Sequence, residues 1–168
     1  METYYDAVAT GYDELHGQEQ LKKLQIIEQE ANIKGLILDV GAGTCIAAKY
    51  FAKKGKQVIS LDPSAKLLKQ GKGITIVGKA EAIPFKDRMF NTVISLTALH
   101  HCDLEKALRE IKRVARDDAT IAISFLKQSQ KLQEFEQLFA TIIGSSKKID
   151  AEKDFIYIKR SFPLNSSA

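Results

Sequence analysis

Two aspartates, 23 positions apart, stand where short apolar stretches end, and their type and spacing could serve a ligand. Asp39 lies in Leu36-Ile37-Leu38-Asp39-Val40-Gly41, and Asp62 ends the stretch from residue 57 to 61. An aspartate carboxylate can accept two hydrogen bonds from a pair of hydroxyl groups, and it attracts cations. Asp62 therefore suits a ribose, and Asp39 suits a positively charged group. Asp62 could also be a turn or N-cap residue before the next helix, and both roles can hold together.

The elements that must position these acids are a strand, a glycine turn and a helix. The apolar run at 36–40 is bounded by glycines and predicts a buried parallel strand. Gly41 and Gly43 allow positive φ and close approach of a ligand to the backbone. The apolar spacing from Ile46 to Phe51 then predicts a helix whose free N–H groups face the ligand. Open α/β sheets bind ligands at this carboxyl edge.

The glycine pattern separates two ligand classes. A dinucleotide site needs G-x-G-x-x-G, and its third glycine would fall at Ile46, so a nicotinamide oxidoreductase is disfavoured. The stretch instead resembles D-x-G-x-G-x-G, motif I of class I S-adenosylmethionine-dependent methyltransferases, with Cys45 in place of the last glycine. An acid there suits the cationic ammonium and sulfonium of S-adenosylmethionine. The alternative is an α/β turn without a ligand.

A second stretch narrows the resemblance. Residues 78–91, Gly-Lys-Ala-Glu-Ala-Ile-Pro-Phe-Lys-Asp-Arg-Met-Phe-Asn, are similar to the G-D-A-E-x-L-P-F-x-D-x-x-F-D pattern of small type 11 methyltransferases, which resemble ubiquinone and menaquinone methyltransferases. Lys79 stands where the family has an acid facing the adenine amino group, and a lysine cannot accept a hydrogen bond. Adenine recognition would then rest on the Ala80 backbone, on neighbours or on Glu81. Asn91 replaces the last acid.

The N-terminal tyrosines could also serve the cofactor. Tyr5-Asp6 and Tyr12-Asp13 resemble, with one extra residue between them, the segment that covers the cofactor in type 11 methyltransferases. Packing of an N-terminal helix is the competing interpretation. Gly11 and Gly17 are expected to interrupt the helical pattern, and a second helix is expected over 18–32.

The resemblance implies a fold, a cofactor and a site. The fold is a doubly wound, mostly parallel α/β sheet of seven strands in the order 3-2-1-4-5-7-6, with the last pair antiparallel and helices on both faces. The cofactor is S-adenosylmethionine, and the predicted cofactor-binding residues are Tyr4, Tyr12, Asp39, Gly41, Ala42, Gly43, Asp62, Pro63, Ala80, Glu81 and Leu96. Further strands are expected at 57–62, 73–78, 92–97 and 119–125, helices at 47–54, 65–69, 104–115 and 131–143, and a hairpin from 147–149 and 155–158.

The sequence assigns no catalytic residue. The position after the expected fourth strand lacks the Asn/Asp-Pro-Pro-aromatic motif of nucleobase amino methyltransferases. It carries His100 and His101, either of which could act as a general base or be structural. A zinc site formed with Cys102 is disfavoured, because consecutive residues cannot easily converge on one metal. Methyl transfer from a sulfonium needs mainly a positioned nucleophile.

Composition predicts one domain over residues 1–168. The resemblance implies that it is a methyltransferase domain, with an N-terminal helical lid at 1–34, an α/β core at 35–160 and a tail at 161–168. No apolar run approaches the length that spans a bilayer, so no membrane partner is expected. Two cysteines and no secretory signal predict a cytoplasmic protein. The basic residues Lys106, Arg109, Arg113 and Arg116 form a stripe that is expected to be solvated.

The acceptor is not identified by the sequence. The segments after the fourth and fifth strands are too short to enclose a small ligand, so an open site for a large acceptor, RNA or else protein, is expected unless the N-terminal segment covers it. The net charge of +4 leans weakly toward RNA. The alternative function is a non-catalytic subunit of this fold that binds a partner protein, which the departures at Cys45 and Lys79 slightly favour.

Overall fold

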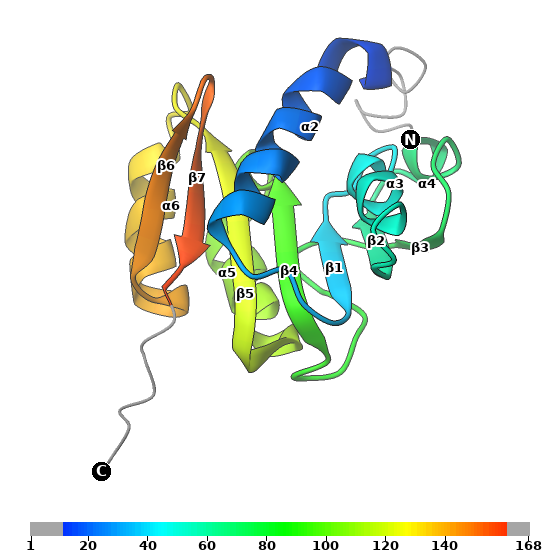
Figure 1. Ribbon diagram of the computed structural model, residues 1–168. Coiled ribbons are helices and arrows are strands. Elements are labelled where there is room, and N and C mark those ends of the chain that lie inside the picture. Colours follow the sequence, from blue (N-terminus) through cyan, green and yellow to red (C-terminus); the bar gives the residue numbers. More distant parts are fainter. Residues whose placement is uncertain (1–11, 161–168) are drawn as a thin grey trace.

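A seven-stranded sheet with helices on both faces forms the protein (Figure 1). This computed structural model describes the backbone of residues 12–160 and the side chains of residues 16–160. The strand order is β3-β2-β1-β4-β5-β7-β6, in which β7 runs antiparallel to both its neighbours and the other pairs are parallel. The predicted fold class and strand order are confirmed.

The elements follow the sequence pattern closely. The strands are β1 Ile37–Val40, β2 Val58–Asp62, β3 Ile74–Val77, β4 Phe90–Leu96, β5 Ala115–Leu126, β6 Ser146–Ala151 and β7 Asp154–Lys159. The helices are α2 Tyr12–Glu30, α3 Ile46–Ala52, α4 Ala65–Leu68, the 3₁₀ turn η2 Leu99–His101, α5 Leu104–Val114, α6 Leu132–Leu138 and the π-helical turn η3 Phe139–Ile143.

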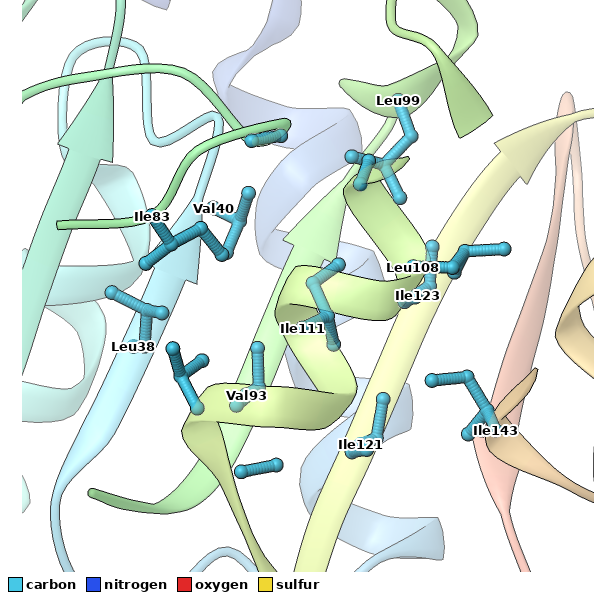
Figure 2. Packing of buried hydrophobic residues seen from close by; sticks show 14 of the residues in the cluster. Leu38, Val40, Ile83, Val93, Leu99, Leu108, Ile111, Ile121, Ile123 and Ile143 are labelled. Carbon is cyan, nitrogen blue, oxygen red and sulfur yellow. The ribbon is translucent and has the colours of Figure 1, made fainter. Parts of the chain in front are cut away.

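Each face of the sheet has its own apolar core. On one face, α2 and α3 pack on β1 and β4 through residues such as Leu24, Phe51 and Ile94. On the other, α5, α6 and η3 cover the centre of the sheet. Figure 2 shows Leu108 and Ile111 of α5 directed at the strands of this second core. The side chains of β1 are buried on both faces, as the continuous apolar run predicted.

The predicted break at Gly17 is wrong. Helix α2 continues through this residue, and a Cβ at Gly17 would meet no atom within 4 Å. A glycine inside a helix costs about 1 kcal/mol relative to alanine. Burial of Leu24 and Ile27 against the sheet outweighs that cost, since tertiary packing supplies most helix stability in proteins.

Two further boundaries differ from the prediction. Strand β5 begins at Ala115 rather than Ala119, because Ala115 pairs with Phe90 of β4 across a register shift. The helix expected over 131–143 ends as an α-helix at Leu138 and continues as the π-helical turn η3. Five apolar residues of this stretch are expected from their spacing to face inward; Phe135, Phe139 and Ile142 are buried, and Leu132 and Leu138 are partly buried.

Arg113 is not part of a solvated stripe, contrary to the expectation. Its guanidinium donates to the carbonyl oxygens of Ile83 at 2.9 Å and Phe85 at 2.8 Å, and it pairs with Asp87 and Glu110. Glu110 in turn accepts from the Ile83 N–H, and Arg113 holds the pKa of Glu110 below its usual range. Arg113 therefore ties α5 to the segment that connects β3 with β4.

We predict that Arg113→Lys lowers the free energy of unfolding by about 1–2 kcal/mol. A lysine presents one compact charge and cannot reach these separate acceptors as a planar fork does. Arg109→Lys is the matched control, because Arg109 pairs with Glu105 on the exposed face of the same helix. The control should lower the free energy of unfolding by less than about 0.5 kcal/mol. Urea unfolding measures both. Equal losses in the two variants would contradict the tie.

Candidate functional site

The carboxyl edge of the sheet carries a pocket of about 220 Å³ at the point where β1, β2 and β4 end. The lining residues come from the turns after these strands and from the segment after β3. They are Val40, Gly41, Gly43, Asp62, Pro63, Leu67, Gly78, Lys79, Ala80, Glu81, Thr97, Ala98, Leu99, His101 and Cys102. The pocket thus lies where strand order reverses between β1 and β4, the usual ligand position in open α/β sheets.

The glycine turn after β1 is fixed to the end of β2 by backbone hydrogen bonds. The N–H groups of Gly41 and Ala42 donate to the Leu61 carbonyl at 2.8 and 2.9 Å. Gly41 has φ of 75°, and a Cβ there would lie 2.3 Å from the Cβ of Ala98. Only glycine therefore fits at position 41, for backbone conformation and for space.

Cys45, the departure from the motif, retains the backbone conformation that a glycine would adopt. Its φ is 65° and ψ is 38°, the left-handed region, at the N-cap of α3. This conformation costs an L-residue roughly 1–2 kcal/mol. The buried Cys45 side chain packs in the core on the α2 and α3 face. The substitution thus leaves the turn's shape unchanged.

Asp62 organises the turn on the far side of the pocket. One carboxylate oxygen accepts from the Gly43 N–H and the other from the Ser64 N–H, each at 2.8 Å. The N-cap of α4 is Ser64, which accepts from Leu67, so the N-cap interpretation of Asp62 is replaced by a turn role. The Asp62 carboxylate also lines the pocket, where a ligand can meet it.

Asp39 is buried, and none of the described residues places a positive charge beside it. Its side chain is 3% exposed, and no hydrogen bond from the described part of the chain reaches its carboxylate. Burial, and secondarily the charge of Asp62, raises the pKa of Asp39 to about 7. A carboxylate in this position is an acceptor without a donor, which favours a cationic or hydrogen-bonding ligand group beside it.

The segment after β3 closes the pocket. Ala80 is buried, Glu81 is partly buried and Lys79 is exposed. Burial, with the adjacent Glu81 carboxylate as a further cause, raises the pKa of the Cys102 thiol to about 12. Cys102 is therefore a neutral thiol and not a nucleophile at physiological pH.

The structure brings nine of the eleven predicted residues together. Gly41, Gly43, Asp62, Pro63, Ala80 and Glu81 line the pocket, and Asp39, Ala42 and Leu96 line a small hollow that shares Gly41 with it. Tyr4 lies outside the described residues, and so does the side chain of Tyr12. The two tyrosines stay predictions.

A second pocket, of about 510 Å³, adjoins the first and was not predicted. It shares Thr97 and His101 with the first pocket, and its remaining described walls come from α2, η2 and the β5–β7 edge. At its base, Lys23 donates to Thr97 Oγ1 at 2.6 Å, and Thr97 Oγ1 donates to Asp154 at 2.6 Å. No sequence motif indicated this group, because its members come from three distant parts of the chain.

His100 lines this second pocket as a neutral imidazole. Burial, and secondarily His101, lowers the pKa of His100 to about 4. Its Nδ1 is buried without a hydrogen-bond partner. His100 can therefore accept a hydrogen bond near neutral pH, although its low pKa makes it a weak general base.

Within residues 12–160, no group of three or more His, Cys, Asp or Glu side chains is arranged to hold a metal ion. None of the helices described is both long and apolar enough to cross a bilayer.

Comparisons with known proteins agree with this geometry. A family model described as a methyltransferase domain matches residues 38–123. An uncharacterised protein of Methanocaldococcus jannaschii is 36% identical over 122 residues, which cover 68% of this chain and 47% of that protein. The demethylmenaquinone methyltransferase of Thermobifida fusca is 31% identical over 136 residues, covering 71% of this chain and 58% of that enzyme. The chain thus spans about half the length of these relatives.

Solved structures show the same fold. A Haloferax volcanii methyltransferase, determined in complex with the Trm112 methyltransferase activator, superimposes with a TM-score of 0.76 at 14% identity, covering 96% of this chain and all of that one. Among the other structures that share the fold are proteins described as S-adenosylmethionine-dependent methyltransferases.

We predict that Asp39→Asn stabilises the ligand-free protein above pH 7. The raised pKa means that the folded state prefers the protonated acid, so wild-type stability falls as pH rises from about 4 to about 7 and then levels. Asp39→Asn has no carboxylate to ionise, so its free energy of unfolding should exceed that of the wild type by an amount that grows from pH 4 to pH 7, to the order of 2–4 kcal/mol. Chemical unfolding at pH 4 to 8 measures it, with Asp118→Asn, an exposed acid, as the control. An advantage that is independent of pH would show that Asp39 is ionised in the folded state at low pH.

Proposed function

Because the chain belongs to the type 11 family of S-adenosylmethionine-dependent methyltransferases, we propose that it transfers a methyl group from S-adenosylmethionine to an acceptor molecule. The observation that carries the proposal is the pair of buried aspartates on either side of the glycine turn. Asp39 lacks a hydrogen-bond partner among the described residues, and Asp62, which accepts from the N–H groups of Gly43 and Ser64, lines the pocket.

The residues present fit the cofactor's chemistry. Asp39, in the hollow beside Gly41, suits the positively charged amino acid end, and Asp62 suits the ribose hydroxyls. The glycine turn lets the backbone approach the ligand closely. Ala80, Glu81 and Lys79 line the pocket and, as the resemblance implies, would recognise the adenine, toward which Lys79 can donate but not accept a hydrogen bond.

S-adenosylmethionine, when bound, supplies a methyl group activated by its sulfonium. The task of the chain is then to hold the acceptor in line and to exclude water. Thr97 lies between the two pockets, so the second pocket offers the acceptor a place next to the cofactor. We name no catalytic base, since His100 is neutral and weakly basic.

The N-terminal tyrosines and the compartment complete the proposal. Tyr4 and Tyr12 would cover the cofactor as the lid does in the family. Helix α2, which begins at Tyr12, lies across one face of the sheet (Figure 1) and lines the second pocket and the small hollow at Asp39. Both cysteines are free, which fits a reducing, cytoplasmic setting.

A second candidate function is that of a subunit that works with a partner protein. The observation in its favour is the open edge of the sheet at β3. Ile74 is 44% exposed and Val77 is 58% exposed, and β3 pairs only with β2 among the described strands, so its other edge is open there. Exposed strand edges of this kind accept a strand from another chain. The Haloferax volcanii complex with Trm112 shows that a protein of this fold can be bound to an activator.

We predict that Asp62→Ala weakens binding of S-adenosylhomocysteine by roughly 10- to 100-fold, because a charged hydrogen-bond partner of the ribose is lost. Asp62 also supports the turn, so the ribose role is tested with the 2′-deoxy analogue. The wild type should prefer the hydroxylated ligand, and the variant should not, as measured by calorimetric titration.

Comparing the wild type and Asp62→Ala with both ligands separates contact with the ribose from support of the turn. If Asp62→Ala weakens both ligands equally and the preference for the 2′-hydroxyl persists, the carboxylate acts only on the turn. Unchanged affinity of the variant would remove the ribose assignment altogether.

We predict that Ile74→Asp/Val77→Lys abolishes binding to the Trm112-type protein of the source cell while leaving the affinity for S-adenosylhomocysteine unchanged. Charged edge residues prevent strand addition, and β3 side chains do not line the cofactor pocket. Co-expression followed by light scattering measures the complex. A wild-type protein that stays unbound, or a complex that survives the double substitution, would contradict docking on β3.

A further inference from the structure

The second pocket is a built site rather than a surface irregularity. Its described lining residues are His16, Glu19, Gln20, Lys23, Thr97, His100, His101, Leu126, Lys153 and Asp154. Helix α2 supplies one wall, and the start of β7 with the end of β5 supplies another. The sequence predicted an open site unless the N-terminal segment covered it, and α2, which belongs to that segment, supplies one wall. The wall formed by the β6–β7 hairpin was not predicted.

The base of this pocket is a buried ion pair. Lys23 is 5% exposed and Asp154 is 1% exposed, and their charged groups lie 3.2 Å apart. Thr97 bridges them, since its hydroxyl accepts from Lys23 and donates to Asp154. A buried ion pair is weak evidence for stability, because desolvation of two charges offsets their attraction. Its position beside the cofactor pocket therefore calls for another reason.

The backbone of Thr97, which bridges the Lys23–Asp154 ion pair, is in a strained conformation. Its φ is 52°, a conformation that is an outlier for a β-branched residue. The Thr97 N–H donates to Ser124 Oγ at 2.9 Å, and its hydroxyl has the two contacts with the ion pair. Strained residues of this kind persist only where several contacts determine them, and they concentrate at functional sites.

The Lys23 ammonium keeps one N–H donor for which the described residues provide no acceptor. An ammonium carries three N–H donors, and Thr97 and Asp154 account for at most two of them. The Asp154 oxygen that meets Lys23 is also occupied by the Thr97 hydroxyl. The two lysines and the two carboxylates that line the pocket have no net charge together. The remaining N–H donor of Lys23 therefore decides the preference of the pocket, and it favours an anionic ligand over a cationic one.

We propose that this pocket is the acceptor site and that Lys23, positioned by Asp154 and Thr97, anchors an anionic oxygen of a small hydrophilic acceptor. The inference rests on the proposed methyltransferase function and names the acceptor class for that same site. Leu126 is the only aliphatic residue among the described ones that line the pocket. A lipid-like acceptor would leave these charged and polar groups without water or partners, which is costly. Demethylmenaquinone, named in the T. fusca relative, is of that disfavoured class.

The first test measures anion binding directly. Acetate and its neutral isostere acetamide are titrated into the protein saturated with S-adenosylhomocysteine, and backbone amide signals of Thr97 and His100 are followed by NMR. We expect acetate to bind at millimolar concentration and acetamide to cause no comparable shift. Lys23→Met should weaken acetate binding at least about tenfold, since a charge-assisted hydrogen bond is lost.

Lys22→Met is the matched control, because the neighbouring Lys22 is exposed and pairs with Glu152. If Lys23→Met does not fold because Asp154 is left unpaired, Lys23→Met/Asp154→Asn removes both charges together. Retained affinity for S-adenosylhomocysteine in the variants separates a failure of this inference from a failure of the proposed function. Equal binding of acetate and acetamide, or acetate binding unchanged by removal of Lys23, would overturn the inference.

The second test identifies the acceptor class. Tritiated S-adenosylmethionine is incubated with the protein and an extract of the source cell, which is then separated into lipid, RNA, protein and water-soluble small-molecule pools. Label should enter the small-molecule pool in a product that Lys23→Met does not form. Label in lipid, RNA or protein would overturn the inference, and where no pool is labelled the acetate titration decides it alone.

Discussion

Asp39 and Asp62 are both buried at the carboxyl edge of the sheet, close enough for the charge of Asp62 to raise the pKa of Asp39. Of the two, only Asp62 accepts hydrogen bonds from the described residues. Asp62 is held by the amides of Gly43 and Ser64, so its charge is part of the folded turn. Asp39 has no such partners among the described residues, and its pKa is raised to about 7. A cationic ligand group beside Asp39 would stabilise the ionised carboxylate, which no described residue does.

The parallel arrangement of β1, β2 and β4 imposes this proximity. Each strand ends at the same edge, so the turns after them must share one space. The same edge receives β7 in the opposite direction, which brings the start of that strand to the end of β5. The antiparallel strand therefore contributes Asp154 to a region otherwise built from strand ends, and α2 contributes Lys23 from the covering layer.

The sequence predicted the strand order, and nine of the eleven residues that it proposed for cofactor binding lie together at the carboxyl edge of the sheet. Both results depend on local patterns: an apolar run, a glycine turn and an acid at a strand's end. It did not predict the Lys23–Thr97–Asp154 group, since three distant segments meet there and none carries a local signal. It misjudged Gly17 because packing outweighed helix propensity, and it misjudged Arg113 because the spacing of a basic stripe does not show which member reaches a neighbouring loop.

Cys45 has a consequence at a second position. A Cβ on Gly71 would lie 2.5 Å from the Cβ of Cys45, 2.6 Å from its sulfur and 2.6 Å from the backbone carbonyl oxygen of Thr44. The first two contacts depend on the side chain at 45, but the third is to the backbone and would remain with any residue there. The turn after β1 therefore excludes a side chain at position 71, in a distant part of the chain, for as long as the turn keeps its shape.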